Sequence, residues 1–168
     1  QYGIHASNGT RLDIRDATVS ATTSDSRGVV MAGSGGGVGS GEAPIATITN
    51  SIIEGAAYGA SLSVNSVLDV AGSRVAGTSV NSIGIGLFSG TATFRDGSVV
   101  TGQTNGAQIM TLTVPGVPDE GRTLILDNAS LIGVTGSGVL GQRRNASSTS
   151  TATISLRNGA SVSGGNGT

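Results

Sequence analysis

Six short stretches of the chain share one pattern of apolar and polar positions. Each reads apolar, any, apolar, any, then Asp, Asn or Gly, then a small residue, and soon afterwards another apolar residue. The copies begin at Leu12, Ala46, Leu68, Ala92, Leu124 and Ile154, and the last copy carries one extra residue. Because period-two alternation is typical of strands, each copy predicts a short strand, a sharp turn and a second short strand.

The residue at the predicted turn belongs to only three types. It is Asp16, Asn50, Gly72, Asp96, Asn128 and Asn158 in the six copies. These types adopt the left-handed backbone conformation far more readily than β-branched residues do. We therefore expect the chain to turn at the same point in every copy.

A second repeat lies between the copies of the first. A glycine opens another alternating stretch at Gly3, Gly28, Gly59, Gly84, Gly106 and Gly138. One face of these strands carries the pairs Ile4/Ala6, Val29/Met31, Ala60/Leu62, Ile85/Leu87, Ala107/Ile109 and Val139/Gly141. The other face carries His5, Val30, Ser61, Gly86, Gln108 and Leu140. Each repeat of the chain thus contains three predicted strands.

The repeat length, about 22 to 34 residues, lies in the range of solenoid proteins. The sequence therefore predicts an all-β fold, a right-handed, single-stranded parallel β-helix of about six coils, in which stacking buries the apolar face that one coil cannot bury alone. Three inward columns are predicted: Leu12/Ala46/Leu68/Ala92/Leu124/Ile154, Ile14/Ile48/Val70/Phe94/Leu126/Leu156 and Val19/Ile53/Val75/Val99/Leu131/Val162. We expect the large side chain of Phe94 to need the small neighbour Ala92 or Gly86.

The longer repeats carry their additional residues in three insertions, 33–44, 115–122 and 142–151. Each insertion follows a glycine-opened strand, so all three should emerge on one side of the solenoid, where they do not disturb stacking. Loops on a rigid scaffold commonly carry binding residues. The candidate partner-binding positions are Ser34, Gly37, Glu42, Asp119, Glu120, Arg143 and Arg144.

Composition narrows the possible functions. The 168 residues include 29 glycines, no cysteine, nine arginines as the only basic residues besides one histidine, and 11% charged residues. The formal net charge of −1 gives no electrostatic argument for nucleic acid or anionic membrane as a partner. The sequence shows no signal peptide and no apolar run long enough to span a membrane. We expect residues 1–168 to form one β-helix segment of a longer domain.

Several segments of the sequence resemble the passenger region of pertactin-like autotransporters of Gram-negative bacteria. They are Gly59-Ala-Ser-Leu-Ser-Val, Ser66-Val-Leu-Asp-Val-Ala-Gly-Ser-Arg-Val, Gly90-Thr-Ala-Thr-Phe-Arg-Asp-Gly-Ser-Val and Asn158-Gly-Ala-Ser-Val. The resemblance implies an adhesive stalk at the cell surface or outer membrane, or secreted after cleavage. Its implied partners are a host-cell receptor or surface glycan, and the neighbouring coils of the full-length passenger.

Enzymatic chemistry is weakly represented, and the sequence predicts a non-enzymatic protein without catalytic residues, cofactor or metal. His5 is the only histidine, and the Asp and Asn residues at the fifth position of the repeat are explained as turn formers. The alternative is a carbohydrate-active β-helix enzyme, a lyase or glycosidase, or another glycan-binding solenoid. Asp13 and Asp69 share an outward column, with Thr47 between them, while Arg15, Arg95 and Arg157 share the next and form a mildly basic strip.

Overall fold

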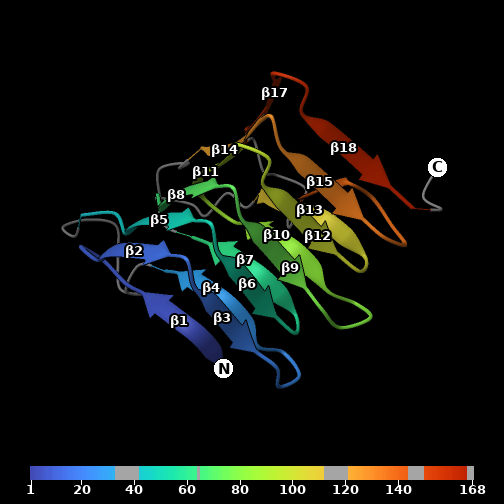
Figure 1. The fold of residues 1–168 in the computed structure, drawn as a ribbon. Coiled ribbons are helices and arrows are strands. Elements are labelled where there is room, and N and C mark those ends of the chain that lie inside the picture. Colours follow the sequence, from blue (N-terminus) through green and yellow to red (C-terminus); the bar gives the residue numbers. More distant parts are fainter. Residues whose placement is uncertain (33–41, 64, 112–120, 144–149, 166–168) are drawn as a thin grey trace.

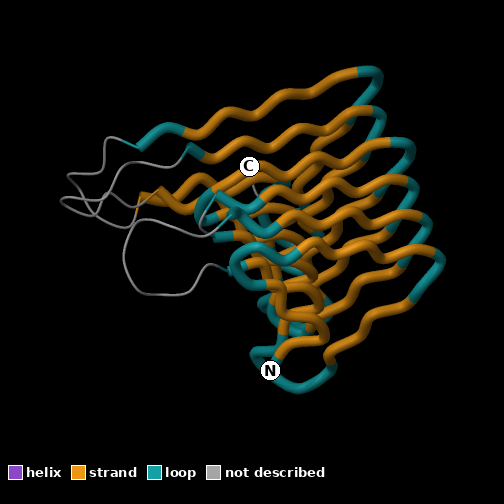
Figure 2. The backbone as a smooth tube through the Cα atoms, turned by 90° about the vertical axis from the view of Figure 1, so that its left-hand side faces the viewer, coloured by secondary structure: helices purple, strands orange, loops and turns teal. Residues whose placement is uncertain are grey.

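The computed structural model describes residues 1–32, 42–63, 65–111, 121–143 and 150–165. The described chain forms 18 strands and no helix, arranged as three parallel sheets of six strands each. The chain passes through the three sheets in turn and then starts the next coil, so that the coils stack one above another (Figures 1 and 2). The predicted fold class, an all-β parallel β-helix with about six coils, is confirmed.

We name the sheets A, B and C in the order in which each coil visits them. Sheet A contains β1 (Tyr2–Ala6), β4 (Arg27–Met31), β7 (Tyr58–Leu62), β10 (Ile83–Leu87), β13 (Asn105–Thr111) and β16 (Val139–Arg143). Sheet B contains β2 (Arg11–Arg15), β5 (Ile45–Thr49), β8 (Val67–Ala71), β11 (Gly90–Arg95), β14 (Arg122–Asp127) and β17 (Ala152–Arg157). Sheet C contains β3 (Thr18–Ala21), β6 (Ile52–Gly55), β9 (Arg74–Gly77), β12 (Val99–Gly102), β15 (Ser130–Gly133) and β18 (Ser161–Gly164).

The predicted turn residues lie at the corner between sheets B and C. All six have a positive φ, between 48° and 57°. This conformation is sterically costly for a β-branched residue, which explains why only Asp, Asn and Gly occupy it. The turn prediction is therefore confirmed in every coil.

The strand register confirms two of the predicted inward columns completely, those that run through Leu12 and through Ile14. The third contains one wrong residue, because Val75 pairs with Val100 and not with Val99. At this turn Asp96 is followed by Gly97, and both have a positive φ, so the turn is one residue longer. A turn with two positive φ values also accounts for the extra residue of the last copy, at Asn158 and Gly159. Val100 is fully buried, whereas Val99 lies on the outer side.

In three consecutive coils the small residue that follows the turn is a serine, and these serines form a ladder of buried hydroxyl groups. The Oγ atoms of Ser51, Ser73 and Ser98 each accept a hydrogen bond from the backbone N–H of the coil below, at Ala17, Ser51 and Ser73. Ser51 and Ser73 in turn donate to the carbonyl two residues earlier, at 2.7 Å. The ladder satisfies polar groups that the turn would otherwise bury without partners.

The glycine-opened strands have the predicted register in sheet A. A Cβ at Gly28 would lie 2.6 Å from the carbonyl oxygen of Gly59, so glycine is required here by close packing of the coils and not by a positive φ. Phe94 is fully buried between Val70 and Leu126. Gly86 does not make room for it, because a Cβ at Gly86 would meet Tyr58 and Phe88 on the outside of the sheet.

The two ends of the stack differ in how well they cover the core. In the first coil Ala6 and Ile14 are buried. In the last coil the inward residues Ile154, Leu156 and Val162 are 46%, 51% and 38% exposed. A hollow of about 490 Å³ opens beside Ile154, against Ile109 and Val139. The last coil thus presents apolar side chains and strand edges without a covering coil among the described residues.

Candidate functional site

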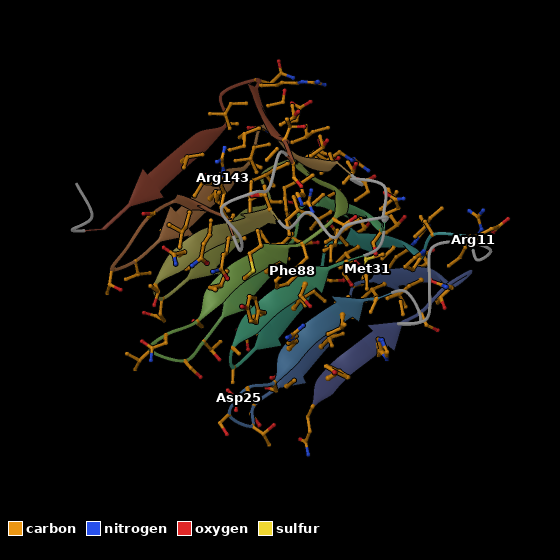
Figure 3. All side chains as sticks on the ribbon, turned by 180° about the vertical axis from the view of Figure 1, so that it is seen from behind. Arg11, Asp25, Met31, Phe88 and Arg143 are labelled. Carbon is orange, nitrogen blue, oxygen red and sulfur yellow. The ribbon has the colours of Figure 1, made fainter. Side chains whose placement is uncertain are left out.

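The three insertions leave the solenoid at the same corner. They lie between β4 and β5, between β13 and β14, and between β16 and β17, so each connects sheet A to sheet B. Their described flanks confirm the prediction that the insertions share one side of the molecule. In Figure 3 the corner is marked by Met31, which ends β4, and by Arg143, which ends β16.

Only two of the seven candidate partner-binding positions fall within the described residues, Glu42 and Arg143. Ser34, Gly37, Asp119, Glu120 and Arg144 lie outside them. Glu42 is exposed, and its carbonyl accepts a 2.6 Å hydrogen bond from the N–H of Gly9. Arg143 is exposed at the opposite end, where it pairs in register with Thr111. The two side chains share a corner, but several coil spacings of about 4.8 Å separate them, so they form no common site.

A buried arginine supports the base of one insertion. Arg122 is only 5% exposed and begins β14, directly after the segment 112–121. Its Nε donates to the carbonyl oxygens of Phe88 at 2.8 Å and Met110 at 2.9 Å. A buried guanidinium must be hydrogen-bonded, and here it joins two neighbouring coils at the corner. The sequence pattern treated Arg122 only as the last residue of an insertion.

The outer face of sheet B carries the charged columns that the sequence predicts, and the structure pairs most of these charges. Arg15 donates from Nε to Asp13 at 2.9 Å, and Arg95 donates to Asp69 at 3.0 Å and also contacts Asp96. The hydrogen bond from Arg15 lowers the pKa of Asp13, and the hydrogen bond to Asp69 raises the pKa of Arg95. Arg15 and Arg95 are therefore neutralised locally, so the basic strip predicted with Arg157 is largely compensated.

The same pairing bears on the enzymatic alternative. Asp13 and Asp69 stand two coils apart, with Thr47 between them in register, and each faces its own arginine. A glycosidase needs two carboxyl groups that flank one bond, one of them able to hold a proton near neutral pH. Asp13, whose pKa is lowered by Arg15, does not meet the second requirement. Within the described ranges, no group of three or more His, Asp or Glu side chains could hold a metal ion.

The outer face of sheet A contains a different set of side chains. We call it the aromatic face and define it by Tyr2, His5, Arg27, Tyr58, Phe88, Gln108 and Gln142. Three of the four aromatic residues of the chain lie here, while Phe94 alone is in the core. In the view from behind, Phe88 lies on this side of the molecule (Figure 3).

Sequence reasoning did not identify the aromatic face. It placed His5 and Gln108 on the outer side of their strands, but it did not consider the residue that precedes each repeated glycine. That residue is Tyr2, Arg27 and Tyr58 in the first three coils, and these positions pair with one another across sheet A. An aromatic or arginine residue before the glycine was the available signal.

No family model, curated protein or solved structure matches this chain. No helix in the described parts of the chain is long and apolar enough to cross a membrane.

Proposed function

We propose that this chain is a segment of an autotransporter-like passenger, a rigid stalk that holds an adhesive surface away from a bacterial cell. The observation that carries the proposal is the difference in length variation between two corners of the coils. The corner between sheets B and C is kept to two or three residues, while the corner between sheets A and B admits insertions of different length. A scaffold whose three long insertions all lie at one corner suits display of binding segments.

The exposed end of the solenoid is consistent with this role. Ile154, Leu156 and Val162 continue inward columns that are buried in the preceding coils. Further coils stacked on β16, β17 and β18 would bury these side chains and pair the strand edges. We therefore include neighbouring coils of a longer passenger among the partners, together with a host-cell receptor or surface glycan.

The enzymatic alternative has less support. A lyase or glycosidase would need reactive carboxyl groups in a cleft, whereas the carboxylates of Asp13 and Asp69 on sheet B are each held by an arginine. A glycan-binding solenoid without catalysis remains compatible with the same scaffold.

Attachment to cells tests the proposal. The purified chain is coated on beads, and bead attachment is measured on several human epithelial cell lines. The matched variant replaces residues 32–44 by the four-residue linker 63–66, which connects the equivalent strands β7 and β8. We expect the wild type to attach and the shortened variant to attach less at an unchanged thermal midpoint. Absence of attachment to every cell line, or cleavage of a glycan by the purified chain, would contradict the proposal.

A further inference from the structure

Two aromatic rings lie over one glycine on the outer side of sheet A. A Cβ at Gly86 would lie 2.8 Å from Cε1 of Tyr58 and 3.1 Å from Cε2 of Phe88. The ring centroids of Tyr58 and Phe88 are 6.4 Å apart, with 55° between the planes. Both side chains are only partly buried. Because Gly86 has no side chain, both rings can lie against its backbone. Parts of both rings remain accessible to solvent.

Polar side chains extend this arrangement in both directions along the stack. The guanidinium carbon of Arg27 lies 5.0 Å from the centroid of the Tyr58 ring, and its Nη1 donates to Ser61 at 3.2 Å. On the other side, the Tyr58 hydroxyl donates to Oε1 of Gln108 at 3.2 Å. Nε2 of Gln108 in turn donates to Oε1 of Gln142 at 2.9 Å. The side chains are therefore held in place before any ligand arrives.

The aromatic face carries the positive charge of Arg27 and no acidic residue on its strands. None of the six strands of sheet A contains Asp or Glu, although the chain has ten acidic residues. Arg27 has no carboxylate partner among the described residues, in contrast to Arg15, Arg74 and Arg95, which all form ion pairs. Tyr2 and His5, with ring centroids 5.2 Å apart, extend the face to the first coil. The face offers a cation without a competing anion.

We propose that the aromatic face binds an acidic glycan chain laid along the stack of coils. The inference rests on the proposed function as an adhesive scaffold and names a ligand class and a surface for it. The accessible parts of the Tyr58 and Phe88 rings contact the C–H faces of sugar rings. The amide groups of Gln108 and Gln142, which both donate and accept, bind hydroxyl groups. Arg27 binds a sugar carboxylate through charge-assisted hydrogen bonds.

The dimensions and chemistry favour a glycan over a protein segment. The face runs across six coils, about 24 Å at the spacing of β-strands, and so can contact several sugar units in a row. Its rings alternate with amide, hydroxyl and guanidinium groups, as the ring faces and hydroxyl edges of a sugar chain require. A protein interface of stable size would need a larger apolar centre.

Binding of defined polysaccharides tests the inference. The probes are polygalacturonate and polysialic acid, and the uncharged match is methyl-esterified polygalacturonate, titrated against the purified chain by fluorescence anisotropy. Arg27→Gln is compared with the matched control Arg95→Gln, which alters the outer face of sheet B. Tyr58→Leu tests the ring while keeping an apolar side chain over Gly86. Thermal midpoints confirm that each variant is folded.

We expect at least one acidic chain to bind and the esterified chain to bind weakly. Arg27→Gln should weaken binding about tenfold, as the loss of a charge-assisted hydrogen bond predicts, Tyr58→Leu should weaken it too, and Arg95→Gln should leave it unchanged. Three results overturn the inference: no acidic chain binds, the esterified chain binds equally, or Arg95→Gln weakens binding as much as Arg27→Gln. If both Arg27→Gln and Tyr58→Leu leave cell attachment intact, this inference is also overturned, while the proposed function stands. Conversely, glycan binding without cell attachment would leave this inference standing and contradict the adhesive role.

Discussion

The connections at two corners of the β-helix differ in how much their length varies. Between sheets B and C, every connection has two or three residues, and the difference is the single glycine after Asp96 or Asn158. Between sheets A and B, the connection ranges from Phe88 and Ser89 alone to the whole of residues 32–44. The first corner is fixed by backbone geometry and buried hydrogen bonds, whereas the second is limited only by where its two ends must meet. Function can vary at the second corner because the first maintains the stack.

The strongest test of this difference inserts two glycines at each corner in turn. Between Asn50 and Ser51, the insertion removes Ser51 from the hydroxyl ladder and shifts β6 relative to β3 and β9. Because a two-residue shift takes the buried side chains of β6 out of line with their partners in β3 and β9, we expect a fall in the thermal midpoint of about 10 °C or more, or loss of folded protein.

The matched insertion lies between Gly36 and Gly37. It lengthens a connection that already varies among coils, and by much less than twofold, so its cost should stay below the roughly 0.6 kcal/mol expected for a doubled loop. Circular dichroism melts of both variants provide the measurement. Equal losses at the two corners would show that the proposed division between them is wrong.

A smaller effect is expected from the turn residue itself. Asn128 has a φ of 49°, and Asn128→Val forces a β-branched residue into that conformation, at a cost of about 1–3 kcal/mol. The control Thr93→Val changes an outward-facing strand residue and should alter stability by less than about 0.5 kcal/mol. Urea denaturation measures both changes, and equal midpoints for the two variants would refute the turn assignment.

The hydroxyl ladder allows a milder test of the same corner. Ser73→Ala leaves the buried N–H of Ser51 without its acceptor, which should destabilise the protein by about 1–3 kcal/mol. Ser20→Ala, at an exposed position of sheet C, should have almost no effect. The urea midpoints of the two variants provide the measurement. A neutral Ser73→Ala would mean that the ladder is dispensable, and that alanine serves as well here as at the equivalent positions Ala17, Ala129 and Ala160.

The smallest effect concerns the exposed charges on sheet B between the two corners. Arg15 lowers the pKa of Asp13, so the pair stabilises the fold above the carboxyl's ordinary pKa and loses that contribution as the pH falls through the lowered value. Arg15→Gln should return the pKa of Asp13 toward its ordinary range without a measurable change in stability at neutral pH, because exposed ion pairs contribute little. NMR titration of the Asp13 carboxyl measures this, and an unchanged pKa would contradict the assigned pairing.

Most of the fold could be predicted because its rules are local. A turn residue such as Asn50 must tolerate a positive φ wherever it occurs, and the alternation of Ile48 with its neighbours fixes a face without knowledge of the rest of the chain. The prediction for Val99 was wrong because the outcome at this position depends on a contact between coils. Whether Asp96 and Gly97 together form the turn depends on how Val100 packs against Val75 in the coil below.

The candidate site was less accessible to sequence reasoning. The common corner of the insertions followed from their position between strands, but Glu42 and Arg143 proved to lie far apart along the stack. The aromatic face was missed because Arg27, Tyr58 and Gln108 are separated by 31 and 50 residues and meet only when coils 2 to 5 are stacked.

The sequence by itself determined the repeat, the turn positions and the apolar columns, because each depends on the conformational preferences and alternation of neighbouring residues. The tertiary structure alone decided which outward side chains become neighbours. Stacking pairs Arg95 of sheet B with Asp69 of the neighbouring coil, and it leaves Arg27 beside an aromatic ring on a sheet whose strands contain no acidic residue. Contacts between coils depend on register across 22 to 34 residues, and a difference of one residue at a single turn is enough to change them.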